Sequence, residues 1–276
     1  MKRAWALLRL LWAFLRRDIQ IAASYRLQFF FQFAGVLSIC ITFFFLSLMM
    51  RRVEGGIIQL EKYGGKYFGF VLVGVAFSTY MDAALRTFAQ AIRQAQITGT
   101  FEAMLTTRAK IGPLIAGSSL YAVLFTSLRT VAFLVFGALI FQQEVHLSTW
   151  PVALLFMGLT LTATMALGIF AAGFIVLFKQ GDPVTAGLAG LSWLLSGIIY
   201  PKEILPHWVQ QVAGALPLTH TLEAMRLVLL TGAPLEVVWG SVVYLSAFSL
   251  VGIPVALAWF IYAVGRARVA GSLANY

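Results

Sequence analysis

Residues Tyr200–Arg226 read YPKEILPHWVQQVAGALPLTHTLEAMR, and three prolines divide a stretch that is otherwise compatible with helix. Proline lacks a backbone N–H and its ring clashes with the preceding turn, so one continuous helix is excluded. The spacing predicts two short helices, Leu205–Ala215 and Leu218–Thr231. Because apolar runs flank the segment and neither helix is long enough to cross a bilayer, residues 201–231 are expected to form an external or re-entrant helix pair.

Polar and aromatic residues give this helix pair two distinguishable surfaces. Trp208 suits the membrane–water interface, where tryptophan is enriched. His220, Glu223 and Arg226 recur at intervals of three, which predicts a common polar side for the second helix.

The composition requires the rest of the chain to cross a membrane. Hydrophobic residues make up 61% of the 276 positions and charged residues 11%, too few to cover a soluble protein. Apolar runs of about 20 residues cross the hydrocarbon core as helices. We expect an all-α integral membrane protein, with one transmembrane domain over residues 1–276. Its six predicted transmembrane helices are Leu27–Met50, Phe68–Thr87, Pro113–Phe141, Pro151–Phe178, Val184–Tyr200 and Val238–Val264.

The charges predict the orientation of these spans. The chain has 20 Lys and Arg residues against 10 Asp and Glu, and most of the cations fall on the segments that are cytoplasmic if both termini are inside. The positive-inside rule therefore places both termini in the cytoplasm. The basic excess orients the protein and gives no reason to expect nucleic acid as a partner.

The first 26 residues have the pattern of a helix lying on the membrane surface. Trp5, Leu8, Trp12 and Leu15 recur at alternating intervals of three and four, and cations line the other side. A signal peptide is the competing interpretation, but Arg9 interrupts its apolar stretch. We expect residues 1–26 to form an interfacial helix in contact with membrane lipids.

Three charged residues fall within the predicted spans. Asp82 and Arg86 stand four residues apart, so they can pair on one helix face, either as an ion relay or as a self-neutralised pair. Arg129 has no such neighbour and requires a partner or water. It either faces a polar cavity or extends toward the headgroups.

Known catalytic motifs are missing from the sequence. The only Gly-Lys pair, Gly65-Lys66, is not followed by Ser or Thr, so there is no P-loop for ATP. The three histidines lie far apart and Cys40 is the single cysteine, which gives no pattern for a metal site or disulfide. We predict a non-catalytic protein with no metal and no cofactor of its own.

Residues Ile97–Arg108, ITGTFEAMLTTR, form an amphipathic pattern on the inner side of the membrane. Glu102 falls in the first turn and Arg108 near the end, as the helix dipole favours. Phe101, Met104 and Leu105 share one face. A helix over residues 97–110 with an apolar face on an inner loop is expected to bind a partner, or else to rest on the lipid surface.

Three stretches together resemble the permeases of type-2 ABC exporters. GTFEAMLTTRAKIGPL, from Gly99, is similar to the GTLExLLxTP-type element of that family, although Arg108-Ala109 stands where a Thr-Pro pair is common. SGIIYPKEILPHW and PLTHTLEAMR resemble its SGxxxPxxxLP and PLTxxxxxxR elements. In that family the inner amphipathic helix is a coupling helix that contacts a separate ATPase, and the broken segment forms outer re-entrant helices.

The resemblance assigns roles to two sets of residues. The ATPase-coupling set is Gly99, Thr100, Phe101, Glu102, Met104 and Leu105, with Arg16, Arg17 and Asp18 of the interfacial helix. The outer-gate set is Ser196, Gly197, Pro201, Leu205, Pro206, Pro217, Leu218, Thr219 and Arg226.

The resemblance also implies a function. It predicts the permease subunit of an ATP-driven exporter in the bacterial inner membrane, paired with an identical or similar permease and with two copies of an ATPase that binds ATP and Mg²⁺. Residues YRLQFFFQF replace the LGxxW-like element of polysaccharide exporters, which favours a drug, lipid or lipid-linked cargo. The alternatives are a polysaccharide or glycolipid exporter, an ion-coupled carrier that uses Asp82 and Arg129 with His220, or a lipid-modifying enzyme.

Overall fold

The computed structural model describes residues 9, 12–13, 15–17, 19–20, 26–50, 58–97, 111–140, 142, 145–178 and 183–269. Within these ranges every regular element is helical, which confirms the predicted all-α class for this part of the chain. The α-helices are α2 (Arg26–Met50), α3 (Tyr67–Ile97), α5 (Ile111–Ile140), α6 (Trp150–Phe178), α7 (Pro183–Leu195), α8 (His207–Gly214), α9 (Pro217–Thr231) and α10 (Trp239–Val269). Three short 3₁₀ helices join them: η1 (Ile58–Tyr63), η2 (Leu147–Thr149) and η3 (Lys202–Ile204).

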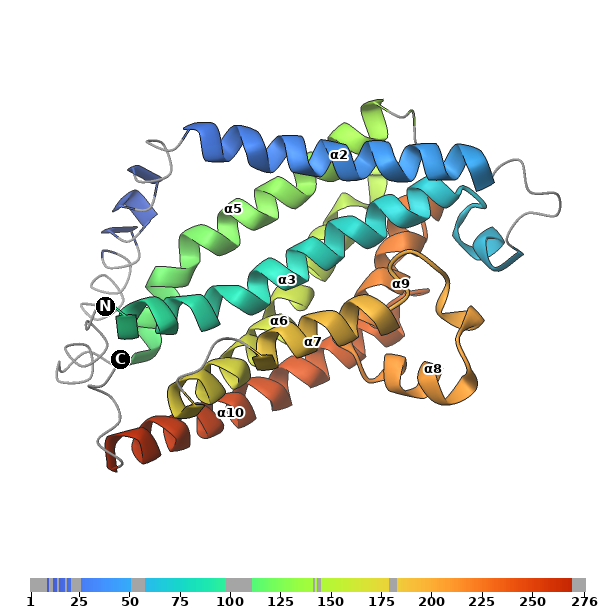
Figure 1. The fold of residues 1–276 in the computed structure, drawn as a ribbon. Helices are drawn as coiled ribbons and strands as arrows, with labels where there is room; N and C mark the ends of the chain where they lie inside the picture. Colours follow the sequence, from blue (N-terminus) through green and yellow to red (C-terminus); the bar gives the residue numbers. More distant parts are fainter. Residues whose placement is uncertain are drawn as a thin grey trace.

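The long helices run side by side, and the chain reverses between consecutive ones (Figure 1). The end of α3, the start of α5 and the end of α10 share one end of the bundle. The 3₁₀ helix η1 and the short α8 lie at the opposite end. This division agrees with the predicted inner and outer segments.

Four helical segments are long and apolar enough to cross a membrane by length and composition: Tyr67–Thr87, Tyr121–Ile140, Trp150–Phe178 and Trp239–Ala267. They correspond to four of the six predicted spans. Among the described residues, Leu37–Met49 and Pro183–Leu195 are shorter apolar helical stretches. A multi-pass membrane protein is therefore supported, and the count of six spans stays a prediction.

The predicted span Val184–Tyr200 is wrong at its outer end. Helix α7 stops at Leu195, so its 13 residues reach roughly 20 Å, less than the ~30 Å of a hydrocarbon core. The cause is local: Gly197 has φ +71°, a left-handed conformation that interrupts the helix. The Tyr200 hydroxyl then donates a hydrogen bond back to the carbonyl of Leu194, which closes the turn.

Helix α3 is the centre of the bundle. Of its membrane-length segment 83% is buried, against 28% for α10, whose outer side is free to face lipid. Phe70, Phe77 and Tyr80 are fully or almost fully buried on α3, and the helix packs against α2, α5, α6, α7 and α9. A displacement of α3 would therefore shift its contacts with most of the other helices.

The two short helices predicted after the fifth span are present as α8 and α9. Pro206 precedes α8, and Pro217 occupies the first turn of α9, where its missing N–H costs nothing. Gly232 ends α9 in the left-handed conformation and donates its N–H to the carbonyl of Leu227. Most residues of α9 are buried against α3, α6 and α10, so this helix is part of the core, whereas Trp208 on α8 is exposed.

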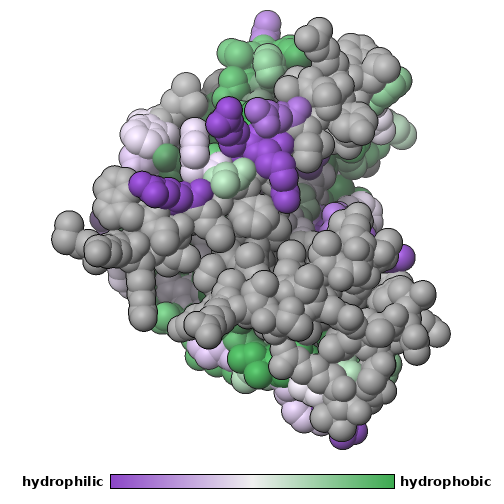
Figure 2. Space-filling view, turned by 90° about the vertical axis from the view of Figure 1, so that its left-hand side faces the viewer, coloured by the Kyte–Doolittle hydropathy of each residue, from purple (hydrophilic) through white to green (hydrophobic). Residues whose placement is uncertain are grey.

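The end of the bundle where α3 and α10 terminate is the basic one. Among described residues there, Arg93 and Arg266 are exposed on α3 and α10. Seen from this end, hydrophilic side chains gather beside hydrophobic flanks (Figure 2). The positive-inside rule predicts that such an end lies in the cytoplasm, and this orientation stays a prediction.

Candidate functional site

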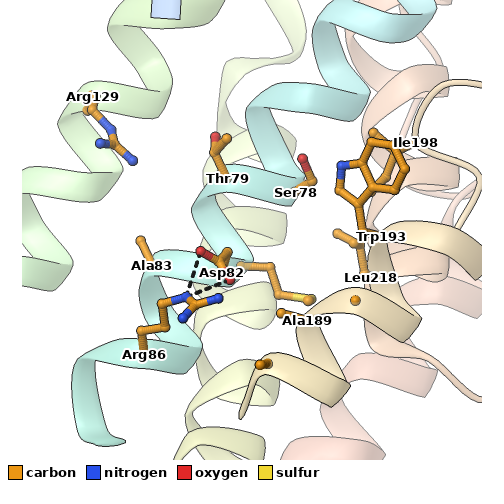
Figure 3. Close-up of a pocket in the computed structure, with 13 residues that line it drawn as sticks. Ser78, Thr79, Asp82, Ala83, Arg86, Arg129, Ala189, Trp193, Ile198 and Leu218 are labelled. Atoms are coloured by element: carbon orange, nitrogen blue, oxygen red, sulfur yellow. Dashed lines mark hydrogen bonds and ion pairs between the residues drawn. The ribbon is translucent and has the colours of Figure 1, made fainter. Parts of the chain in front are cut away.

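A cleft of about 470 Å³ lies between α3, α5 and α7. Its lining residues are Ser78, Thr79, Met81, Asp82, Ala83, Arg86, Arg129, Ala186, Ala189, Gly190, Trp193, Ile198 and Leu218. The volume falls within the range of small-molecule binding sites. Figure 3 shows the charged side chains on the α3 and α5 side of this cleft and Trp193 on the other.

The charged wall on α3 consists of the Asp82–Arg86 pair. Nε of Arg86 donates to both carboxylate oxygens of Asp82, at 2.9 and 3.0 Å. The i,i+4 pairing expected from the sequence is therefore present. Ser78 belongs to the same face, since residues 78, 82 and 86 follow one another at intervals of four, and this spacing could have identified the wall from the sequence.

Arg129 reaches the same cleft from α5. It is half-buried, and its guanidinium extends toward α3 (Figure 3). Of the two placements that the sequence leaves open for Arg129, the structure shows the one beside a polar cavity. Together with the neutralised Asp82–Arg86 pair, Arg129 gives the described cleft one excess positive charge.

The opposite wall is apolar and partly open. Trp193 is 49% exposed, and Ala186, Ala189 and Gly190 of α7 present little side-chain volume. A Cβ added at Gly190 would meet no heavy atom within 4 Å. The cleft thus combines a cationic side with an apolar side that is accessible from outside the protomer.

A second cluster, at the outer end of α3, is built around Arg226. This α9 residue is only 3% exposed. Its Nε donates to the carbonyl of Phe70 at 3.2 Å, and its Nη2 donates to the carbonyls of Gly197 and Ile198 at 2.9 and 2.8 Å. The guanidinium also lies 3.4 Å from the centre of the Phe70 ring. We call Arg226 with these three partners the arginine anchor.

The anchor joins three elements that are distant in the sequence: α9, α3 and the turn after α7. Burial lowers the pKa of Arg226 to about 9, and nearby acidic groups and Tyr63 oppose that shift, so the side chain stays protonated at neutral pH. A buried cation bonded to three carbonyl oxygens fixes the position of the turn relative to α3.

Gly74 makes this close approach possible. A Cβ at this position would overlap the carbonyl oxygen of Ile198 and lie 2.8 Å from Nη2 of Arg226. Only glycine lets the backbone of α3 come this close to the turn. The sequence offers Gly74 merely as one small residue within an apolar span, so its role is recognised only in the folded chain.

Glu223 forms a surface clamp beside the anchor. Its two carboxylate oxygens accept hydrogen bonds from Nζ of Lys62 and of Lys202, each at 2.7 Å, which ties η1 and η3 to α9. Burial by itself raises the pKa of Glu223, but the two lysines outweigh it and hold this pKa below its ordinary value.

The predicted common polar side of α9 is wrong. Glu223 faces the lysines and Arg226 faces α3, whereas His220 stacks on Tyr244 of α10 with 3.8 Å between ring centres. Nε2 of His220 lies 2.9 Å from the carbonyl oxygen of Gly214. Successive steps of three residues turn each side chain by about 60° from the previous one, and a helix packed on several sides gives each a different neighbour. The structure therefore separates His220 from Asp82 and Arg129, with which the carrier hypothesis grouped it.

The outer-gate residues divide into two groups. Those that are buried are Ser196, Gly197, Pro201, Pro217, Leu218, Thr219 and Arg226. Leu205 is half-buried and Pro206 is exposed. Among the described atoms, the buried hydroxyls of Ser196 and Thr219 have no hydrogen-bond partner. Their role in a gate stays a prediction.

The coupling residues lie largely beyond what the structure describes. Gly99, Thr100, Phe101, Glu102, Met104 and Leu105, together with Asp18, fall outside the described residues. Arg16 and Arg17 are described and exposed. No described part of the chain groups three or more His, Cys, Asp or Glu residues as a metal site would require. The described Cys40 is a buried free thiol.

Residues 9–230 match the family described as ABC-2 type transporter. The chain belongs to this family. The match covers both the cleft and the arginine anchor, and it confirms the resemblance drawn from the three sequence stretches. Members of the family are membrane permeases of ABC transporters, which work with an ABC ATPase.

Curated relatives agree with this assignment. Nodulation protein J of Rhizobium leguminosarum bv. viciae is 28% identical over 192 residues, 66% of each chain. Nodulation protein J of Rhizobium meliloti (strain 1021) is 27% identical over 201 residues, 69% of this chain and 68% of the relative. Inner membrane transport permease YhhJ of Escherichia coli (strain K12) is 32% identical over 116 residues, 42% of this chain. The aligned part spans about two thirds of the nodulation proteins and 31% of YhhJ.

Proposed function

We propose that this ABC-2 type chain is the permease subunit of an ATP-driven exporter, a single non-catalytic transmembrane domain powered by a separate ATPase. The observation that carries the proposal is the cleft of about 470 Å³ that lies beside two membrane-length helices, α3 and α5, and the shorter α7 of a family-matched permease. Its cationic and apolar walls suit a hydrophobic or amphiphilic cargo taken from the cytoplasm or the inner leaflet. The similarity to an inner membrane transport permease supports the same location.

Helix α3 supports a mechanical link between the ATPase and the outer end. It is one continuous helix of 31 residues, roughly 46 Å long. Its inner end, Ile97, directly precedes the segment proposed as the coupling helix, and its outer turns carry Phe70 and Gly74 of the arginine anchor. A push on the coupling helix when the ATPases close on ATP would therefore move the anchor and open the outer gate.

The proposed assembly has two permease copies, identical or similar, and two ATPase copies that hold ATP and Mg²⁺. Gly187 and Gly190 on α7 face open space within the protomer, which supports α7 as a close-packing face for the second permease. Gly197 lies beyond the end of α7 and does not extend this face.

The test is ATP-dependent export by variants of the coupling segment. Phe101→Asp and Glu102→Arg should abolish export and release the ATPase during affinity purification in mild detergent, while membrane insertion is unchanged. The matched control is Glu61→Arg, a charge reversal on an exposed residue of η1 at the opposite end. Normal export by both coupling variants, or export without any copurifying ATPase, would overturn the proposal.

A further inference from the structure

The positive charge of Arg129 is not balanced by an acidic side chain among the described residues. Both oxygens of Asp82 are engaged by Arg86, and among the described residues the guanidinium of Arg129 has no hydrogen-bond or ion-pair partner. A guanidinium at this position in a membrane span is costly unless a counter-charge or water meets it. A ligand that brings a negative charge into the cleft would relieve that cost.

The surroundings of Arg129 restrict the ligand further. Asp82 and Arg86 cancel each other, so the net charge of the cleft is that of Arg129 and favours a ligand with a compact anionic group. Trp193, Ile198 and Leu218 form an apolar wall across the cleft. A small inorganic anion would leave that wall in contact with water, whereas a hydrocarbon chain attached to the anion would cover it.

The shape of the cleft agrees with an amphiphile that is only partly enclosed. A volume of about 470 Å³ accommodates a headgroup and the first part of a chain. On the side of Gly190 and the exposed Trp193 the described side chains leave the cleft open toward the proposed second permease, so the chain can extend into the interface between the two copies.

We infer that this cleft binds an amphiphilic cargo through its anionic headgroup, with Arg129 as the cation that binds the headgroup and the Trp193 wall as the contact for its hydrocarbon. The inference rests on the proposed export function and names the class of its cargo. Asp82 and Arg86 act as a neutral, polar wall. Because Arg86 pairs with it, the carboxylate of Asp82 repels the anionic headgroup less strongly than an unpaired carboxylate would. Selectivity for one anionic group over zwitterionic or cationic groups follows from Arg129.

The binding test uses three amphiphiles that share a dodecyl chain: dodecyl phosphate, dodecylphosphocholine and dodecyltrimethylammonium. Equilibrium binding to the purified full chain in a nonionic maltoside detergent is measured against protein-free micelles. We expect dodecyl phosphate to bind about tenfold or more tightly than the other two. Arg129→Gln should remove the preference and Arg129→Lys should retain most of it. Leu128→Gln, a neutral polar change at the exposed neighbour on α5, is the matched control and should leave it intact.

Two further arms identify the source of the anion. Inorganic phosphate at the same concentration should not displace dodecyl phosphate, and displacement would overturn the assignment to an amphiphile. In vesicles that contain the permease with its copurified ATPase, dodecyl phosphate should stimulate ATP hydrolysis in the wild type and not in Arg129→Gln. Binding without stimulation would make it a resident lipid and overturn the cargo assignment.

The outcomes separate this inference from the export function. Equal binding of the three amphiphiles, or a preference that Arg129→Gln leaves unchanged, overturns the inference while ATP-dependent export can stand. Failure of the coupling variants to alter export overturns the function. The binding preference is a separate result, because binding in detergent is measured without the ATPase. If Arg129→Gln does not fold, as judged by its melting curve, the Trp193→Ala variant tests the apolar wall: it should weaken dodecyl phosphate binding about tenfold, and unchanged binding would overturn the inference.

Discussion

Replacing Arg226 by methionine tests whether the arginine anchor holds the outer segment in place. Methionine keeps an unbranched side chain of similar length but donates no hydrogen bond. The change removes the donors that serve the carbonyls of Phe70, Gly197 and Ile198, and the cation that lies against the Phe70 ring.

The structure sets the size of the effect. Three hydrogen bonds from a charged donor, at about 1.5–3 kcal/mol each, give a gross loss of about 5–9 kcal/mol. The guanidinium is almost fully buried, and methionine avoids its desolvation cost, which offsets several kcal/mol of that loss. We expect a net loss of about 2–4 kcal/mol in the free energy of unfolding. Arg226→Lys should recover less than half of it, because one ammonium nitrogen cannot reproduce the planar fork that reaches carbonyls on two elements.

The assay is unfolding of the purified protein in a nonionic detergent, followed by the loss of tertiary signal and by the melting temperature. The control is Arg93→Met, which removes an exposed arginine from the inner end of α3 and should change the free energy of unfolding by less than about 0.5 kcal/mol. If Arg226→Met unfolds at the same denaturant concentration as the wild type, the anchor does not hold α9 and the turn after α7 to α3.

Two further predictions concern neighbours of the anchor. Gly74→Ala should destabilise the protein by about 1–3 kcal/mol, because the new Cβ overlaps the Ile198 carbonyl. The control is Gly158→Ala on α6, which should be neutral because a Cβ there meets nothing within 4 Å. Equal melting temperatures for the two variants would contradict the close approach of α3 to the turn. The lysines hold the folded-state pKa of Glu223 below its ordinary value, so the stabilisation is present above the ordinary 4.5 and is lost as the pH falls through the folded-state value. Melting curves from about pH 6 to pH 3 should therefore show a smaller acid-induced decrease for Glu223→Gln than for the wild type, with Glu61→Gln as control; identical decreases in all three proteins would show that the clamp does not contribute.

Local sequence features predicted the helix boundaries well wherever a backbone constraint was present. Pro206 and Pro217 separate α8 from α9, and both helices are where the prolines required them. The outer end of the fifth apolar run was misplaced because the run continues in hydropathy through Ile198 and Ile199 while Gly197 turns the backbone away. Hydropathy reports the transfer of side chains into an apolar environment, and it is insensitive to a single change in φ.

The site was only partly predictable for a different reason. The Asp82–Arg86 pair follows from an interval of four on one helix, so the sequence contains it. That Arg129 joins the same cleft depends on how α5 packs against α3, which no interval within α5 specifies. The grouping of His220 with Arg226 failed because α9 is enclosed by several helices, and each direction around it meets a different partner.

By itself the sequence determined that this chain is a helical membrane protein with a broken outer segment, because composition, proline positions and helical intervals act through solvation and local backbone geometry. Its membership of the ABC-2 type family rests on similarity to known members over residues 9–230. The tertiary structure alone decided which atoms meet Arg226: the carbonyl of Phe70 lies 156 positions away in the sequence, and those of Gly197 and Ile198 lie 29 and 28 positions away. Backbone carbonyls are the same chemical group at every residue, so only packing, permitted here by Gly74, selects the three that bind the buried guanidinium.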